Sequence, residues 1–475
     1  MDLLIIESFT LTPHLETAGE IAIRSAISGQ KTGFSFIYVN NLDTHKHKVK
    51  SPIQKALGSG PKAKVRQLQS AMSAYGVNIL LPPSLSADIK REIQSYAERA
   101  PRNLDKLRAY QYRKADLGLA TLSSLISRTL TIEPDIEANR ELIQSHLLSS
   151  ATVYEKAKAL ILAHQPKKVV SFNGRFACAK PIFEAAKHLG VEVGYHERGA
   201  TYERYQLYEK QPHDYVYIRQ LIAKHWQDAG EDRVQKAHTF FSRRRDGDGI
   251  GWPSFTAEQK KELVPVREEK IRQIVYYSSS DDEFAATGEL STQPIFGTQR
   301  QSIKFLIDWV AVQEGIQLTI RVHPHLQKKS ARDRNWWQSL RGPNVTVIPS
   351  DSPIDSYALM NWADIVVTYG STVGIEANYW GTPSILLGDS FYSGMNCVYE
   401  PQSTGAVVQL LTSTDLRALP QENCLPYGYH YVCQGIRYQY YRPDNLFAGK
   451  FEDEYLTQET TLYKTLRKMW YGYVK

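Results

Sequence analysis

Two hydroxyls flanked by two glycines, between a buried strand and a helix, are the residues of this chain best suited to chemistry. The run GSTVG occupies residues 370–374 and directly follows an apolar strand. The first N–H groups of a helix have no partner within it, and the helix dipole favours negative charge at that end. We therefore predict that Gly370, Ser371, Thr372 and Gly374 hold a phosphate group.

A histidine follows another predicted strand of the same half of the chain. His323 and Pro324 come directly after the strand Leu318–Val322. Ligands of parallel α/β sheets bind at the carboxyl ends of the strands, which predicts that the imidazole lies at the ligand edge. The alternative is that His323 has only a structural role. If a histidine does bind the ligand, His325 is the alternative to His323.

Ser279 and Ser280 belong to the run SSSDDE, which ends the predicted strand Ile274–Tyr277. Their place at the end of a strand puts them at the same ligand edge. They either contact the ligand or cap a helix in a polar loop.

These motifs resemble those of GT-B glycosyltransferases, enzymes with two Rossmann-like domains facing a cleft. The His-Pro and Ser-Thr pairs are similar to motifs of bacterial sialyltransferases and Kdo transferases of capsule and surface-polysaccharide biosynthesis. The resemblance implies that His323, Ser371 and Thr372 hold the phosphate of a nucleotide-sugar donor. A CMP-sugar such as CMP-Kdo or a sialic-acid-like sugar is favoured, and a UDP- or GDP-sugar comes second. It also implies that Glu376 binds the donor ribose, although a charge stabilising the helix N-terminus is the alternative.

The first half of the chain carries polar residues at the ends of two successive predicted strands, Asn173 and Arg175 after one and Glu197 and Arg198 after the next. Glycosyl transfer with inversion needs a base for the proton of the acceptor hydroxyl. Glu197 is the first candidate for this catalytic role and Glu16 the second. Asn173, Arg175 and Arg198 are predicted to bind the acceptor, with an ion pair that only shapes the loop as the alternative.

No cofactor is expected, because the nucleotide-sugar is a substrate. No metal site is expected either, since the GT-B resemblance implies that helix dipoles and side chains stabilise the leaving phosphate. Asp246 and Asp248 have DxD spacing, but they lie in the charged, glycine-rich run 243–253, which we interpret as a linker. The four cysteines lack the paired spacing of a zinc site, and they fit a reducing cytoplasm.

Alternating strand and helix patterns predict an α/β fold with parallel sheets. We expect an N-terminal Rossmann-like acceptor domain (1–250) with a helical insertion at about 85–165, and a C-terminal nucleotide-sugar domain (251–425). The aromatic-rich segment 426–475 is expected to be a helical tail that packs back on the N-terminal domain. The predicted strands are 3–7, 34–39, 78–81, 168–172 and 192–196 in the first domain and 274–277, 318–322, 345–348, 365–368 and 384–387 in the second. The predicted helices are 14–28, 62–75, 86–97, 138–163 and 181–189 in the first domain and 302–314, 332–340, 354–362 and 375–380 in the second.

The totals are those of a globular protein: 475 residues, 42% hydrophobic and 23% charged, with a net charge of +7. No apolar run approaches the ~18 residues of a membrane span, and the N-terminus resembles a first strand more than a signal peptide. We expect a cytoplasmic protein that binds a nucleotide-sugar donor and a glycan or glycolipid acceptor, and no nucleic acid. Lys464, Arg467 and Lys468 in the tail also suit peripheral contact with the inner membrane.

Two other functions share this architecture. A non-hydrolysing sugar-nucleotide epimerase would carry further acidic and histidine residues for elimination chemistry. A non-catalytic nucleotide- or glycan-binding protein would keep the fold without a base.

Overall fold

The computed structural model describes residues 1–39, 60–249, 259–280, 294–324 and 331–457, together with the single residues Thr256, Leu326 and Lys329. The chain forms two compact units. Unit 1 contains residues 1–128 and 133–212 and the chain from Gly435 onward, and unit 2 contains essentially His213–Gln434. The boundary at Pro212 lies well before the linker predicted at 243–253. Residues 243–245 are not a linker but the last turn of a helix that packs within unit 2.

The sheet of unit 1 runs in the order β12-β6-β5-β4-β1-β2-β3. Its strands β5, β4, β1, β2 and β3 are parallel. At one edge β6 pairs antiparallel with β5, and β12 pairs antiparallel with β6. The strands are β1 (Leu3–Glu7), β2 (Thr32–Phe36), β3 (Asn78–Leu80), β4 (Lys168–Phe172), β5 (Glu192–Arg198), β6 (Arg204–Tyr208) and β12 (Ile436–Arg437). The helices of unit 1 are α1 (His14–Ile27), α3 (Pro61–Ser73), α4 (Ala87–Glu98), α5 (Leu104–Arg108), α6 (Leu117–Thr129), α7 (Arg140–His164) and α8 (Lys180–His188).

The sheet of unit 2 is wholly parallel and runs β11-β10-β7-β8-β9. Counted from the first strand of each unit, both sheets have the order 3-2-1-4-5, which is the Rossmann order. The strands are β7 (Arg272–Tyr277), β8 (Ile316–Arg321), β9 (Val345–Ile348), β10 (Ile365–Thr368) and β11 (Ser384–Leu386). The helices are α9 (Tyr215–Gln227), α10 (Arg233–Arg245), α11 (Gln299–Val310), α12 (Ala331–Ser339), α13 (Ser356–Trp362), α14 (Val373–Tyr379), α15 (Thr404–Thr412) and α16 (Leu425–Cys433). The predicted α/β fold with two Rossmann-like domains is confirmed.

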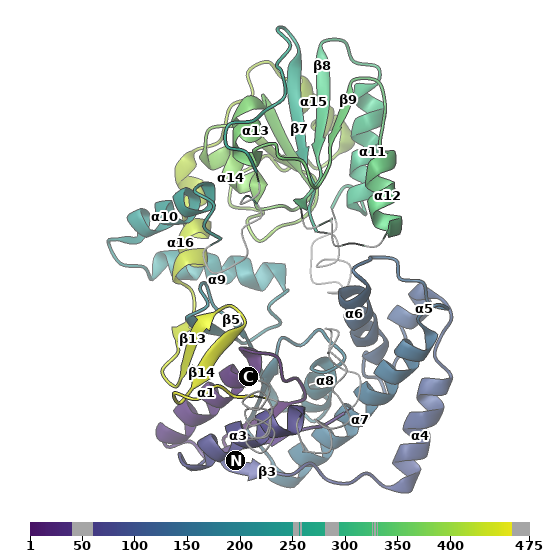
Figure 1. Ribbon diagram of the computed structural model, residues 1–475, viewed down its shortest axis with the longest axis vertical. Coiled ribbons are helices and arrows are strands. Elements are labelled where there is room, and N and C mark those ends of the chain that lie inside the picture. Colours follow the sequence, from purple (N-terminus) through teal and green to yellow (C-terminus); the bar gives the residue numbers. More distant parts are fainter. Residues whose placement is uncertain are drawn as a thin grey trace, which may run out of the picture. The chain divides into compact units, whose positions relative to one another are not determined.

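Both faces of the sheet of unit 2 are covered by helices (Figure 1). Ile274 and Tyr276 of β7 pack with residues of α11, α12 and α15 on one face. Val275 and Tyr277 pack with α13 and α14 on the other face. Because alternate residues of a strand point to opposite faces, a strand covered on both sides must be apolar throughout. This explains why the sequence shows these strands as continuous apolar runs.

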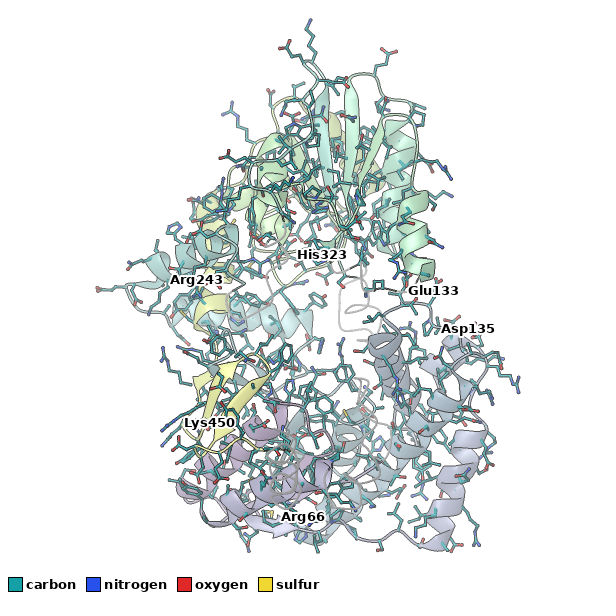
Figure 2. All side chains as sticks on the ribbon, viewed as in Figure 1. Arg66, Glu133, Asp135, Arg243, His323 and Lys450 are labelled. Atoms are coloured by element: carbon teal, nitrogen blue, oxygen red, sulfur yellow. The ribbon has the colours of Figure 1, made fainter. Side chains whose placement is uncertain are left out.

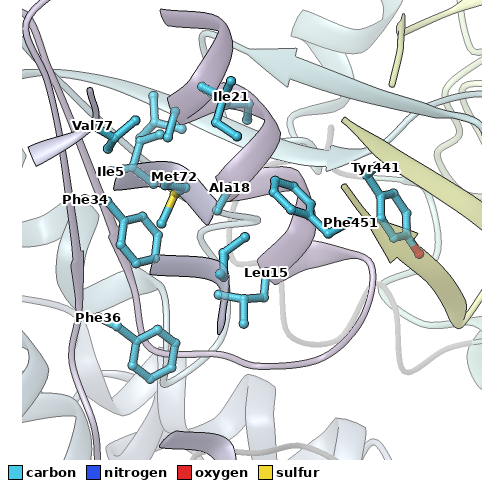
Figure 3. Close-up of a cluster of buried hydrophobic side chains, with 14 of the residues drawn as sticks. Ile5, Leu15, Ala18, Ile21, Phe34, Phe36, Met72, Val77, Tyr441 and Phe451 are labelled. Atoms are coloured by element: carbon cyan, nitrogen blue, oxygen red, sulfur yellow. The ribbon is translucent and has the colours of Figure 1, made fainter. Parts of the chain in front are cut away.

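The C-terminal segment differs from the predicted helical tail. The helix α16 belongs to unit 2, but β12 extends the sheet of unit 1, and β13 (Tyr441–Asn445) and β14 (Ala448–Phe451) form a hairpin. Tyr441 and Phe451 of the hairpin join the core beside α1 (Figure 3). Gly19 in α1 makes room, because a Cβ there would lie 2.5 Å from Leu68 Cδ1 and 3.0 Å from Phe451 Cζ.

Buried polar contacts fasten this segment to α1. Glu20 is fully buried, and its carboxylate accepts hydrogen bonds from the backbone N–H groups of Gln439, Tyr440 and Tyr441 at 2.7–3.1 Å. Arg24 donates to the same carboxylate at 2.6 Å. The tail residues proposed for membrane contact lie outside the described part of the chain.

Candidate functional site

The strand order of unit 2 reverses between β7 and β10. Such a reversal leaves a crevice beyond the carboxyl ends of the two strands, where open α/β sheets bind their ligands. Ser279 and Ser280 follow β7, and Gly370–Thr372 follow β10. The predicted serine run and phosphate loop are therefore neighbours at this point of the fold.

His323, which Figure 2 labels, follows β8. In the order of the sheet, β8 lies on the other side of β7 from β10, the strand that the phosphate loop follows. Two strand spacings, on the order of 10 Å, separate β8 from β10. The backbone N–H of His323 donates to Ser278 Oγ at 2.8 Å, which ties the His-Pro turn to the end of β7. The structure thus brings His323 to the same edge as Ser371 and Thr372, with the serine run between them.

The backbone of Ser279 is fixed by hydrogen bonds, but its hydroxyl makes no hydrogen bond to any described residue. Gln299 accepts from the Ser279 N–H at 2.6 Å and donates to its carbonyl oxygen at 3.2 Å. The side chain is only 4% exposed, and Ser279 Oγ has no hydrogen-bond partner among the described residues. A buried hydroxyl normally has a hydrogen-bond partner. The Ser279 hydroxyl lies at the crevice, where a bound ligand could supply that partner.

The phosphate loop corrects one expectation from the sequence. Thr368 Oγ1 accepts hydrogen bonds from the N–H groups of Gly370 and Ser371 at 3.3 and 2.9 Å. Ser371 Oγ accepts from the Val373 N–H at 3.3 Å. These backbone donors were expected to be unpaired, but the threonine that ends β10 and the loop serine already satisfy them.

Gly374 has a packing role as well as a place in the motif. A Cβ at this position would lie 2.5 Å from the hydroxyl of Tyr392 and 2.7 Å from Thr368 Cγ2. The Tyr392 hydroxyl donates to the carbonyl of Ser371 at 2.6 Å. Close packing of α14 against β10 and this tyrosine is enough to require glycine.

Glu376 is part of a buried charge cluster. It is 1% exposed, and its Oε1 lies 3.0 Å from Arg244 Nε. Its Oε2 accepts a hydrogen bond from the hydroxyl of Tyr357. Arg244 Nη2 also donates to Thr372 Oγ1 at 3.3 Å. Arg244 was assigned to the linker from the sequence, and only the fold shows that it contacts the phosphate loop.

Unit 1 has an equivalent strand-order reversal, between β1 and β4. Asn173, directly after β4, adopts a left-handed conformation with φ of 53°. Its amide donates to Glu197 Oε2 at 2.6 Å, and the Arg198 N–H donates to Glu197 Oε1 at 3.0 Å. Glu197 keeps 21% of its side-chain exposure, so the two bonds orient a carboxylate that solvent can still reach.

His14 was not singled out from the sequence, yet it lies in this cluster. It begins α1, and its Nδ1 is 3.6 Å from Glu197 Oε1. Its ring centroid is 4.0 Å from that of Phe172, the last residue of β4. Its place at the start of the helix that follows β1, near the carboxyl edge of the sheet, was the available signal in the sequence.

Glu16, the second candidate base, lies in the same first turn of α1 as His14. It is 1% exposed, and Oε1 pairs with Lys64 Nζ at 2.7 Å and accepts from Thr12 Oγ1 at 2.9 Å. Lys64 is itself buried and also donates to the carbonyl of Thr10 at 2.9 Å. The structure therefore gives Glu16 the surroundings of a structural ion pair.

The two arginines of the predicted acceptor set lie on aromatic rings. The guanidinium carbon of Arg175 is 4.4 Å from the centroid of Phe176, and that of Arg198 is 5.1 Å from the centroid of Phe447. Burial lowers the pKa of Arg198, an effect that the nearby Glu197 opposes.

The described residues do not include the whole of the predicted site. His325 and the acidic residues of the SSSDDE run lie outside the described residues. Among the residues that the structure describes, no group of three or more His, Cys, Asp or Glu is arranged to hold a metal ion. Asp248 of the DxD run forms an exposed ion pair with Arg243. No helix in the described ranges combines the length and apolarity needed to cross a membrane.

No family model matches this chain, and a search of curated proteins gave no match. Among solved structures, the chain is similar to the beta Kdo 2,4 transferase of Thermosulfurimonas dismutans KpsC. The identity is 13% over 56% of this chain and 80% of that one, with a TM-score of 0.37. The beta Kdo 2,7 transferase of the same KpsC has 11% identity over 66% and 89%, with a TM-score of 0.35. An S. aureus MnaA–UDP co-structure has 11% identity over 92% of each chain, with a TM-score of 0.28. At these TM-scores, the similarities carry no argument about activity.

Proposed function

We propose that this chain is a glycosyltransferase of the GT-B type, which moves a sugar from a nucleotide-activated donor to a surface-glycan acceptor. The observation that carries the proposal is the repeated Rossmann strand order, with polar side chains gathered at the reversal point of each sheet. Unit 2 offers hydroxyls, and unit 1 offers an oriented carboxylate. Two ligand edges of different chemistry suit an enzyme with two substrates.

In this proposal, the donor phosphate binds at the carboxyl edge of unit 2. Ser371 and Thr372 supply hydroxyls. The Ser279 hydroxyl, which has no hydrogen-bond partner in the part of the chain that the structure describes, lies at the adjacent strand end. His323, tied to β7 through Ser278, contacts the same donor. A CMP-sugar, such as CMP-Kdo or a sialic-acid-like sugar, is the preferred donor class.

The acceptor would bind at the carboxyl edge of unit 1, with Glu197 as the base of an inverting transfer. The acceptor oxygen forms a bond to the anomeric carbon while the bond from that carbon to the phosphate oxygen breaks. The hydroxyl proton passes to the Glu197 carboxylate, and the nucleotide leaves with the bonding electrons. Hydrogen bonds from the Asn173 amide and the Arg198 N–H hold the carboxylate in one orientation, as a positioned base requires.

A thermal-shift screen with CMP, UDP, GDP and their sugars tests the donor. A ligand that binds only the folded protein raises the apparent stability by mass action. We expect a shift with at least one nucleotide, followed by transfer of its sugar to a glycan or glycolipid acceptor. Interconversion of the sugar-nucleotide with its epimer would instead identify an epimerase, and binding without turnover would identify a binding protein.

Replacement of Glu197 by Gln tests the acceptor base. The amide keeps the shape of the side chain but cannot take the proton, so we expect transfer to fall about 10²–10⁴-fold while donor binding persists. The Glu16→Gln variant is the comparison, and we expect it to lose stability because buried Lys64 would lack a charged partner. Normal turnover in Glu197→Gln, with a folded but inactive Glu16→Gln, would make Glu16 the base.

A further inference from the structure

Arg244 is the cation that the fold brings to the phosphate loop. It lies in the last turn of α10, where it contacts Thr372 of the loop and Glu376 of the following helix, α14. Its Nε lies 3.0 Å from Glu376 Oε1, and its Nη2 lies 3.3 Å from Thr372 Oγ1. These contacts place a guanidinium beside the hydroxyl that we assign to the donor phosphate.

Glu376 and Tyr357 fix the guanidinium. Both oxygens of the Glu376 carboxylate are occupied, one by Arg244 and the other by the Tyr357 hydroxyl. Burial, and then the negative charge of Glu376, raise the pKa of Tyr357, so the phenol keeps its proton and remains a donor. The nearby Glu376 carboxylate raises the pKa of Arg244 although burial acts against its charge.

The two members of the ion pair differ in exposure. The Glu376 side chain is 1% exposed, whereas that of Arg244 is 30% exposed. The carboxylate is therefore enclosed and holds its partner in place, while part of the arginine side chain still reaches solvent. This is the geometry of a held cation that can receive an anion.

The hydrogen bonds within the loop leave room for a further donor to a bound phosphate. The Gly370, Ser371 and Val373 N–H groups donate within the loop. An arriving phosphate would therefore find fewer backbone donors than the motif suggests. Thr372 Oγ1 accepts from Arg244, which leaves the threonine O–H free to donate to a phosphate oxygen. Hydrogen bonds from guanidinium groups to phosphate are charge-assisted and among the stronger ones in proteins.

We propose that Arg244 binds the phosphate of the donor nucleotide, with Glu376 and Tyr357 as the residues that position it. The proposal rests on the proposed function, because it assigns a further residue to the same donor site. It predicts that the contribution of Arg244 depends on the phosphate and is absent for a nucleoside without phosphate.

The test compares a nucleotide with its nucleoside. Binding of CMP, UDP and GDP, and of cytidine, uridine and guanosine, is measured by calorimetry for the wild type and for Arg244→Gln. We expect at least tenfold weaker binding of the preferred nucleotide and unchanged binding of its nucleoside. Arg243→Gln is the matched control, since Arg243 lies in the same turn but pairs with exposed Asp248, and it should bind both ligands as the wild type does.

Arg244→Gln leaves a buried carboxylate without its cation, which can prevent folding. Glu376→Gln and the double variant Arg244→Gln/Glu376→Gln remove that charge, and they differ from each other only at position 244. We expect at least tenfold weaker nucleotide binding in the double variant than in Glu376→Gln. Equal affinities in this pair, or in the wild type and a folded Arg244→Gln, overturn the role of Arg244 and leave the proposed function standing. Absence of nucleotide binding by the wild type overturns the proposed function itself.

Discussion

The histidine pair between α9 and α16, of which His430 is buried and His225 half-buried, gives the protein a defined response to pH. His225 Nδ1 and His430 Nδ1 are 2.9 Å apart, and the ring centroids are 4.8 Å apart. Two ring nitrogens at this distance share one hydrogen, so one imidazole donates and the other accepts. His430 is 1% exposed, and protonation of both facing nitrogens would put two N–H groups against each other.

Burial, and then the charge that His225 can carry, lower the pKa of His430 from 6.5 to about 3, while Gln434 opposes the shift. Burial also lowers the pKa of His225, with Asp228 opposing this and Lys224 adding to it. When the pKa of a histidine is lower in the folded state than in the unfolded state, its full contribution to stability is present at pH values above the unfolded pKa. That stability is lost as the pH falls from 6.5 toward 3, because the unfolded state binds the proton first.

The size of the effect follows from linkage. Between about pH 7.5 and about pH 5, His430 alone should remove about 2 kcal/mol from the free energy of unfolding, since each unit of pKa difference is worth about 1.4 kcal/mol. Urea unfolding followed by tryptophan fluorescence measures this loss. Every tryptophan except Trp470 lies between His213 and Gln434, so the signal reports mainly on unit 2.

The variant His430→Asn keeps a hydrogen-bonding group near the position of Nδ1 but does not titrate. It should lose about 2 kcal/mol less than the wild type over the same pH interval. The matched control is His164→Asn in the last turn of α7, in unit 1, which should keep the pH dependence of the wild type. If the wild type and His430→Asn lost equal stability on acidification, the reasoning about the histidine pair would be refuted.

Three further outcomes test the donor site and the C-terminal hairpin. Replacing both Ser371 and Thr372 by Ala should weaken nucleotide binding by roughly 1–3 kcal/mol, the scale of hydrogen bonds to a charged group, and unchanged affinity in a folded variant would remove them from the site. His323→Ala should reduce sugar transfer strongly at unchanged melting temperature, whereas a parallel loss of stability would mark a structural histidine. Glu20→Ala leaves three backbone N–H groups of residues 439–441 without an acceptor, so faster hydrogen exchange is expected there, and unchanged protection would contradict this account of hairpin docking.

Much of the architecture could be predicted from local patterns. A parallel strand covered on both faces must be apolar along its whole length, so runs such as Ile365–Thr368 are visible in the sequence. Strand ends followed by glycine, serine or histidine then locate the ligand edge, because parallel strands present their carboxyl ends together. For the same reason, Ser279, His323 and Ser371 could be assigned to one edge of the sheet from the sequence alone.

Long-range contacts decided the rest. Arg244 lies 132 residues before Glu376, and nothing local indicates that the end of α10 packs against the start of α14. Glu16 was the second candidate base from the sequence, and only the fold shows that it is enclosed with Lys64. The sequence by itself determined which segments are buried and which residue types end them, since those depend on neighbours in the chain. Only the tertiary structure decided which charges are enclosed and paired, because burial and pairing depend on segments that are distant in sequence and adjacent in space.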